Sequence, residues 1–165
     1  MRILGIDPGL RRTGYACVQI SARSGEPKLI EAGVLRIATT GPLHARLLQL
    51  SIEFQDVLSD LKPSHAAIET LFSHVKHAQT AMIMGHARGV LLATLAEQTM
   101  LITEFAPKEV KRSVAGNGNA TKEQVRRAVM AQCGLRSLKG PHDASDAMAI
   151  ALTAARRLAH DSKSM

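Results

Sequence analysis

The sequence predicts an α/β fold in which helices cover a mixed sheet. Two observations lead to this class. The chain has 165 residues, of which 45% are apolar, so it can bury one sizeable core. Its periodic segments follow the order of three strands, a helix, a strand, a helix, a strand and then helices. Because no repeat or boundary interrupts this order, we expect one domain over residues 1–165, frayed from about residue 160.

Three strands are predicted near the N-terminus. Residues 2–7 form a short apolar run that ends in Asp-Pro-Gly, which is typical of a strand followed by a tight turn. Residues 13–20 and 29–37 are the next strands, and the polar residues 21–28 are the loop between them. The short connections favour an antiparallel meander.

A long amphipathic helix is expected next, beginning after Gly41 with Pro42 in its first position. Its apolar residues follow the helical period and are Leu43, Leu47, Leu50, Phe54, Val57, Leu58 and Leu61. The pair Lys62-Pro63 is expected to end it.

Strands and helices then alternate. Residues 66–69 and 100–105 are predicted strands. Predicted helices cover residues 76–97, residues 107–115, a segment starting at Thr121, and residues 142–158. Thr121 and Gln124 fit a capping box, which marks the start of the third of these helices.

The bulk properties favour a cytoplasmic protein that has no part in a membrane. No apolar run approaches the roughly 20 residues of a membrane span, and the first residues do not form an export signal. Cys17 and Cys133 are expected to be reduced thiols in apolar surroundings.

Positive charge is concentrated in one fifth of the chain. The net charge is +7, and residues 107–140 hold eight cations against Glu109 and Glu123 alone. These cations are Lys108, Lys111, Arg112, Lys122, Arg126, Arg127, Arg136 and Lys139. Such clustering favours contact with a polyanion over an ordinary solvated surface.

Four acidic side chains are candidates for a metal site. Asp7 and Glu69 each end an apolar strand, where an unpaired charge is costly. Asp143 and Asp146 are three residues apart at a helix start, so their carboxylates face one side. Taken singly, each has an ordinary role in a turn, at a strand end or at a helix dipole. Taken together they favour Mg²⁺, which prefers carboxylate oxygens.

These segments resemble the sequence blocks of the RuvC family of crossover junction endodeoxyribonucleases. The matching segments are IDPGLRRTG at 6–14, AIE at 67–69 and DASDA at 143–147, with further likeness in GHARGV at 85–90 and VKRSV at 110–114. The resemblance implies an RNase H-like fold, with a five-stranded mixed sheet flanked by helices. It also implies a homodimer that resolves Holliday (four-way) DNA junctions by paired symmetric nicks, in homologous recombination and DNA repair.

The resemblance assigns the catalytic and metal-binding roles to Asp7, Glu69, Asp143 and Asp146. Two Mg²⁺ ions are expected, with Asp7 bridging them, Glu69 beside the attacking water, and the other two acids on the leaving-group side. Cutting would leave a 5′ phosphate and a 3′ hydroxyl. His142 is the alternative to Asp143 as third ligand, although carboxylates suit magnesium better than imidazole does.

Candidate DNA contacts also come from the resemblance. Lys111 and Lys122 match positions that support phosphate contact, and Arg126, with Arg127, is a further candidate. Each is otherwise an ordinary surface cation. Phe72 resembles an aromatic residue that stacks on an unpaired base, and its alternative role is in the core.

The apolar helix over residues 76–97 is either a central core helix or a dimer interface. Gly85 and Gly89 would let two backbones approach closely, and the resemblance favours the dimer. It further implies a branch-migration helicase complex as partner.

Three alternative functions are open at the level of sequence. The turn at 6–14 also resembles the phosphate-binding turn of sugar-kinase and actin-like ATPases, which need two such lobes where this chain supplies one. The acids could be structural in a silent nucleic-acid-binding module. An RNase H-type enzyme acting on RNA–DNA hybrids would carry the same acids.

Overall fold

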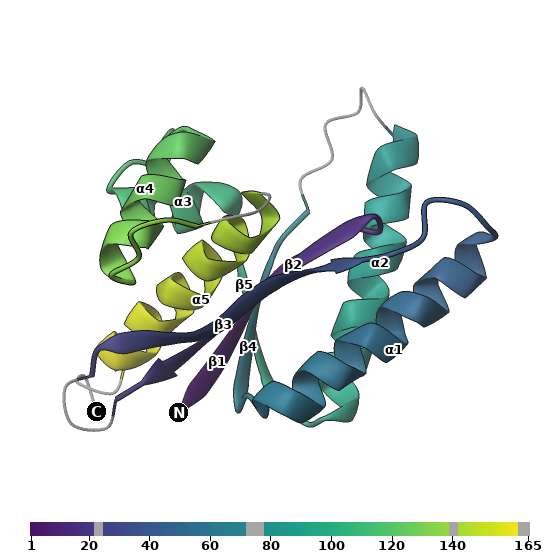
Figure 1. Cartoon of the computed structure of the whole chain (residues 1–165), viewed down its shortest axis with the longest axis horizontal. Coiled ribbons are helices and arrows are strands. Elements are labelled where there is room, and N and C mark those ends of the chain that lie inside the picture. Colours follow the sequence, from purple (N-terminus) through teal and green to yellow (C-terminus); the bar gives the residue numbers. More distant parts are fainter. Residues whose placement is uncertain (22–24, 72–77, 139–141, 162–165) are drawn as a thin grey trace.

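A single sheet between two layers of helices forms the framework of the chain (Figure 1). The structure is a computed structural model, and it describes residues 1–21, 25–71, 78–138 and 142–161. Within these ranges the strands are β1 (Arg2–Asp7), β2 (Arg12–Ile20), β3 (Pro27–Arg36), β4 (His65–Glu69) and β5 (Leu101–Phe105). The helices are α1 (Leu43–Leu61), α2 (Ala78–Glu97), α3 (Pro107–Ala115), α4 (Lys122–Gln132) and α5 (His142–Asp161).

The sheet is mixed, as the sequence predicts. Its five strands lie in the order β3-β2-β1-β4-β5. The first three form the expected antiparallel meander, while β4 pairs in parallel with β1 and β5 pairs in parallel with β4. The carboxyl ends of β1, β4 and β5 therefore meet at one edge of the sheet.

Two hydrophobic cores lie on opposite faces of this sheet. Successive side chains of a strand point to opposite faces, and β1 follows this rule. Leu4 and Ile6 pack in the core beneath α1 and α2, whereas Ile3 packs in the core beneath α3, α4 and α5. Figure 1 shows the two helical layers on either side of the strands.

Helix α5 is the most deeply buried helix among the described elements, and two glycines allow its close approach to the sheet. A Cβ at Gly5 would lie 2.2 Å from the carbonyl oxygen of Ala147, and one at Gly14 would lie 2.1 Å from that of Asp143. Both neighbours are backbone atoms of α5, so no larger residue fits without moving the helix.

Most predicted boundaries are confirmed to within two residues. Helix α3 has the predicted bounds, and the capping box is present, with the Thr121 hydroxyl accepting from the Gln124 amide at 3.2 Å. Lys62 ends α1 in the left-handed conformation, with φ of 46°. The predicted start of the second helix at residue 76 lies outside the described residues.

The starts of β3 and α1 and the end of α5 differ from the prediction. Pro27 opens β3 instead of lying in a loop, which is possible because β3 is an edge strand and needs no donor there. Pro42 caps α1 from an extended conformation instead of occupying its first turn. Helix α5 continues past Leu158 to Asp161, and residues 162–165, which form most of the expected frayed end, lie outside the described part.

No helix among the described residues is long and apolar enough to cross a membrane. Cys17 is buried and Cys133 is half-buried, and both are free thiols as expected.

Candidate active site

Three of the four predicted acids line one cavity at the carboxyl edge of the sheet. Asp7 ends β1 and Glu69 ends β4, and these parallel neighbours are in register through Ile6 and Ile68. Asp146 reaches the same cavity from the first turns of α5. The cavity has a volume of about 240 Å³. At roughly 30 Å³ per water molecule, this volume corresponds to about eight water molecules.

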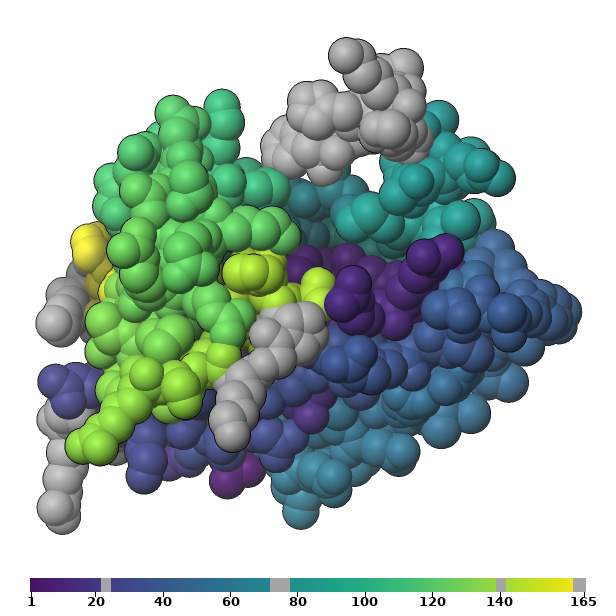
Figure 2. Space-filling view, turned by 45° about the horizontal axis from the view of Figure 1, so that its top comes forward, coloured from purple at the N-terminus to yellow at the C-terminus, as the bar shows by residue number. Residues whose placement is uncertain are grey.

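Asp143 lines an adjoining cavity of about 590 Å³. Asp7 and Lys122 line both cavities, so the two are parts of one cleft. Figure 2 shows the hollow between the green surface of α3 and α4 and the teal surface of α2, with purple N-terminal residues on its floor. His142 is exposed and is not among the residues that line either cavity.

The sheet register explains why Asp143 lies near Asp7. Gly14 is the direct partner of Asp7 across the β1–β2 ladder. The backbone of Asp143 rests on Gly14, in the space where a Cβ would lie. A residue 136 positions later in the chain is thereby held beside the end of β1 (143 − 7 = 136).

The surroundings of Asp7 strongly disfavour its charged form. Burial, followed by the neighbouring charges of Glu69, Asp146 and Asp143, raises the pKa of Asp7 to about 8. The Lys122 ammonium acts in the opposite direction but does not compensate. The charged form of Asp7 therefore lacks sufficient counter-charge from the protein.

Glu69 shares this environment. Burial raises the pKa of Glu69, and Asp146 raises it further, while Lys122 and Lys111 lower it. Burial also disfavours the charged form of Lys122, but the carboxylates of Asp146, Asp7 and Asp143 together outweigh this, so the pKa of Lys122 is raised. The cavity thus holds a coupled set of carboxylates with two lysines at its wall.

Two ion pairs hold the acids of α5. Lys122 Nζ lies 3.2 Å from Asp146 Oδ2, and Arg12 Nε lies 3.8 Å from Asp143 Oδ2. Among the described residues, no three Asp, Glu, His or Cys side chains form a ready-made metal site. The chemistry of the donor set still fits a hard divalent cation, since four acidic side chains face one cleft and the charged form of Asp7 lacks counter-charge.

A family model described as crossover junction endodeoxyribonuclease RuvC matches residues 3–154. The chain belongs to the RuvC family. It is 41% identical over 152 residues to the RuvC of Rhodopirellula baltica, covering 91% of this chain and 83% of that one. It is 38% identical over 151 residues to the RuvC of Chlorobaculum parvum, covering 92% and 79%.

Solved structures confirm the RNase H-like fold. Thermus thermophilus RuvC in complex with a Holliday junction substrate superposes with a TM-score of 0.88 at 28% identity, covering 98% of this chain and 96% of that one. A yeast mitochondrial Holliday junction resolvase, with a TM-score of 0.72 and 16% identity over 98% of this chain and 80% of its own, is similar in fold alone.

In this RuvC-family chain, Arg88 holds the backbone of Glu69 at the end of β4 in place. Its Nε donates to the backbone carbonyl of Glu69 at 3.1 Å, and its guanidinium pairs with Glu104 on β5. The amide of Thr70 donates to the carbonyl of Phe105 at 2.9 Å. These bonds fix the end of β4 to both α2 and β5. Sequence patterns gave Arg88 and Arg12 no role, because their partners are distant in sequence.

The residues that the RuvC resemblance predicts to contact DNA do not all lie at the cleft. Lys111 and Lys122 line the acidic cavity. Arg126 lines neither part of the cleft, and its guanidinium donates to the carbonyl of Leu138. Arg127 lines a different cavity of about 410 Å³ between α3 and α4. Phe72 lies outside the described residues.

Proposed function

We propose that this chain is a metal-dependent endonuclease that resolves Holliday junctions in recombination and repair, by paired symmetric nicks. One observation carries the proposal: four carboxylates from β1, β4 and α5 face a single cleft in a RuvC-family fold. The relatives named crossover junction endodeoxyribonuclease, and the solved complex of a relative with a Holliday junction, support the substrate.

Asp7, Glu69, Asp143 and Asp146 are the proposed catalytic residues and would hold two Mg²⁺ ions. When bound, the ions supply Lewis acidity at the phosphate and lower the pKa of a coordinated water. Asp7 would contribute to holding them because burial and the charges of Glu69, Asp146 and Asp143 disfavour its charged form until positive charge is bound. Asp143 is preferred to His142, because Asp143 lines the cleft while His142 does not.

Lys122 and Lys111 are the proposed phosphate contacts beside the acids. Both line the cavity, and the Lys122 ammonium lies 3.2 Å from Asp146 in the protein alone. When DNA enters, this ammonium can turn to a non-bridging phosphate oxygen and offset the charge that develops during attack. Phe72 and Arg126 stay predictions for base stacking and backbone contact.

A homodimer is proposed through α2. Gly85, His86 and Gly89 lie on an exposed face of this helix, and a Cβ at either glycine would meet nothing within 4 Å. Met82, on the same helix, is 62% exposed. A two-fold dimer would present two such clefts to the two-fold symmetry of a junction. One nuclease domain per chain, a helicase partner and a cytoplasmic location stay predictions.

The test is cleavage of a mobile four-way DNA junction, with magnesium and with chelator, beside a linear duplex and an RNA–DNA hybrid. Paired nicks in the junction alone, and only with magnesium, are expected. Junction binding without any cut would favour the silent module, and preferential cutting of the hybrid would favour an RNase H-type enzyme.

The matched pair for this test is Asp7→Asn and Asp56→Asn. Asp7→Asn is expected to reduce cutting by at least about a thousandfold, consistent with the loss of a ligand that positions a metal ion, and to retain junction binding. Asp56 is exposed on α1, so its variant is expected to cut as the unaltered chain does. Full cutting by Asp7→Asn would refute the assignment.

A further inference from the structure

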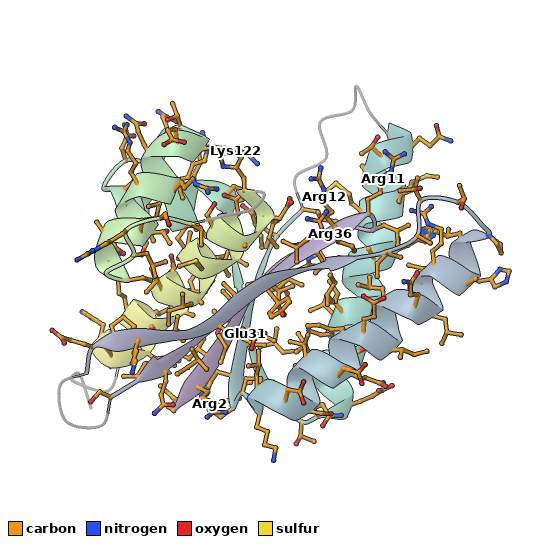
Figure 3. The ribbon with its side chains drawn as sticks, viewed as in Figure 1. Arg2, Arg11, Arg12, Glu31, Arg36 and Lys122 are labelled. Carbon is orange, nitrogen blue, oxygen red and sulfur yellow. The ribbon has the colours of Figure 1, made fainter. Side chains whose placement is uncertain are left out.

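Three arginines stand together at one end of the β2–β3 hairpin, and none of them belongs to the basic stretch over residues 107–140. Arg12 and Arg36 are direct partners across the ladder, so their side chains leave the same face of the sheet. Arg11 is joined to this pair through its carbonyl, which accepts from the Ile37 amide at 3.2 Å. Figure 3 shows the three side chains gathered at this end. We call Arg11, Arg12 and Arg36 the arginine edge.

The arginine edge is unfavourable for the protein alone. Like charges directly opposite each other in an antiparallel ladder destabilise it. Within the described part of the chain, Arg12 pairs with Asp143 at 3.8 Å. Neither Arg11 nor Arg36 has a side-chain hydrogen bond or an ion pair among the residues that the structure describes. All three are exposed, so their guanidinium groups are available to a ligand.

The arginine edge borders the same cleft as the acids. Arg11 and Arg12 line the larger cavity together with Asp7 and Lys122. Lys122 projects from α4 on the other side of the cleft (Figure 3). Arg46 of α1 also lines this cavity, and its Nε is held by the carbonyl of Ala38 at 2.7 Å. Positively charged side chains thus extend from the acidic cavity toward the β2–β3 side of the sheet.

We propose that the arginine edge binds the phosphodiester backbone of the DNA that flanks the cut, on the side of the cleft opposite to α3 and α4. The inference rests on the proposed function. Guanidinium groups match phosphate geometry with two parallel hydrogen bonds, and each phosphodiester presents two free oxygens. A row of phosphates relieves the repulsion between Arg12 and Arg36, which the ion pair of Arg12 with Asp143 offsets only on the Arg12 side.

The test compares Arg36→Gln and Arg11→Gln with Lys28→Gln, in junction binding measured with chelator at several salt concentrations. Lys28 is exposed on the same strand as Arg36, eight residues away, at the opposite end of β3. At about 3.3 Å per residue it lies roughly 26 Å from Arg36. It therefore controls for the loss of one charge far from the cleft.

Each arginine variant is expected to bind the junction about five- to tenfold more weakly at moderate salt. Its slope of log K against log salt is expected to become shallower by about 0.9 for each phosphate that the variant no longer binds. Lys28→Gln is expected to keep the slope of the unaltered chain. The Tm of Arg36→Gln without DNA is expected to equal or exceed that of the unaltered chain, because the like-charge pair is removed.

Slopes and affinities of both arginine variants that match Lys28→Gln would overturn the inference. Weaker binding that accompanies a lower Tm would also overturn it, since the arginines would then be structural. Magnesium-dependent junction cutting by the unaltered chain keeps the proposed function intact in either case. Absence of both cutting and DNA binding in the unaltered chain would instead refute the proposed function.

Discussion

At the scale of single residues, the acidic site is arranged for cation binding at the expense of stability. Asp7 is held among three other acids, and burial with those charges raises its pKa to about 8. Lys122 and Arg12 neutralise only Asp146 and Asp143 directly. Groups kept in such an environment are typical of functional sites, because a purely structural position gains nothing from the repulsion.

Asp7→Asn is therefore expected to stabilise the metal-free chain near pH 8. The folded chain keeps the Asp7 proton up to about pH 8, whereas an unfolded chain loses it near pH 4. The contribution of Asp7 to stability is thus greatest below pH 4 and falls as the pH rises toward 8. The variant escapes this loss, which we expect to exceed about 1 kcal/mol, or roughly 2–4 °C in Tm.

The measurement is thermal unfolding of both proteins with chelator at pH 5 and pH 8. A gap in Tm that favours the variant and widens at pH 8 is the expected result. An equal gap at the two pH values, or a less stable variant at pH 8, would contradict the electrostatic account.

At the scale of elements, the contact of α5 with β1 and β2 assembles the site. Gly5 and Gly14 leave room for the backbone of α5, and the first two turns of that helix carry Asp143 and Asp146. The end of β4 is fixed separately, by Arg88 and by β5. Alignment of the acids therefore depends on how closely a helix packs on a sheet.

Gly14→Ala is expected to displace the start of α5. The added methyl would lie 2.1 Å from the Asp143 carbonyl, and overpacking of this kind costs about 1–3 kcal/mol. Junction cutting should fall at least tenfold, because the carboxylates move relative to Asp7. Denaturant unfolding and cleavage rates measure the two effects, and Gln19→Ala on the exposed part of β2 is the control. A fully active Gly14→Ala would show that the packing does not set the geometry.

At the scale of the whole molecule, the proposed dimer would present two clefts to one junction. The exposed face of α2 is the proposed contact, and the arginine edge lies at the neighbouring end of the sheet. DNA would then contact both the α3–α4 side and the sheet side of each cleft. Paired nicks require both protomers to be held in a fixed relation.

Met82→Glu is expected to break the dimer without unfolding the chain. Met82 is 62% exposed, so a charge there costs little in the protomer but is unfavourable in an apolar contact. Sedimentation at micromolar concentration should change from dimer to monomer, and the two nicks should become uncoupled. Leu101→Glu is the control, since Leu101 is 66% exposed on the edge strand β5. A dimer that survives in Met82→Glu would place the contact elsewhere.

Local patterns in the sequence were sufficient for the order and type of the elements. The meander, the capping box at Thr121 and the bounds of α3 depend on neighbouring residues, and all are confirmed. The structure differs from the prediction at Pro27, which opens β3, and at Pro42, which caps α1. A proline can lie on either side of the start of a strand or helix, so the local sequence does not fix these boundaries. The candidate acids were also predicted from local patterns, namely the strand ends at Asp7 and Glu69 and the helical spacing of Asp143 and Asp146.

The tertiary structure alone decided which charges meet. Arg12 faces both Asp143 and Arg36, and Lys122 faces Asp146, although these partners are far apart in the chain. Hydrophobic period and turn chemistry act over a few residues, so they determine elements and the kind of chemistry at their ends. Coulomb interactions depend on distances in space, which are set by the sheet register and by the packing of α5 on two glycines.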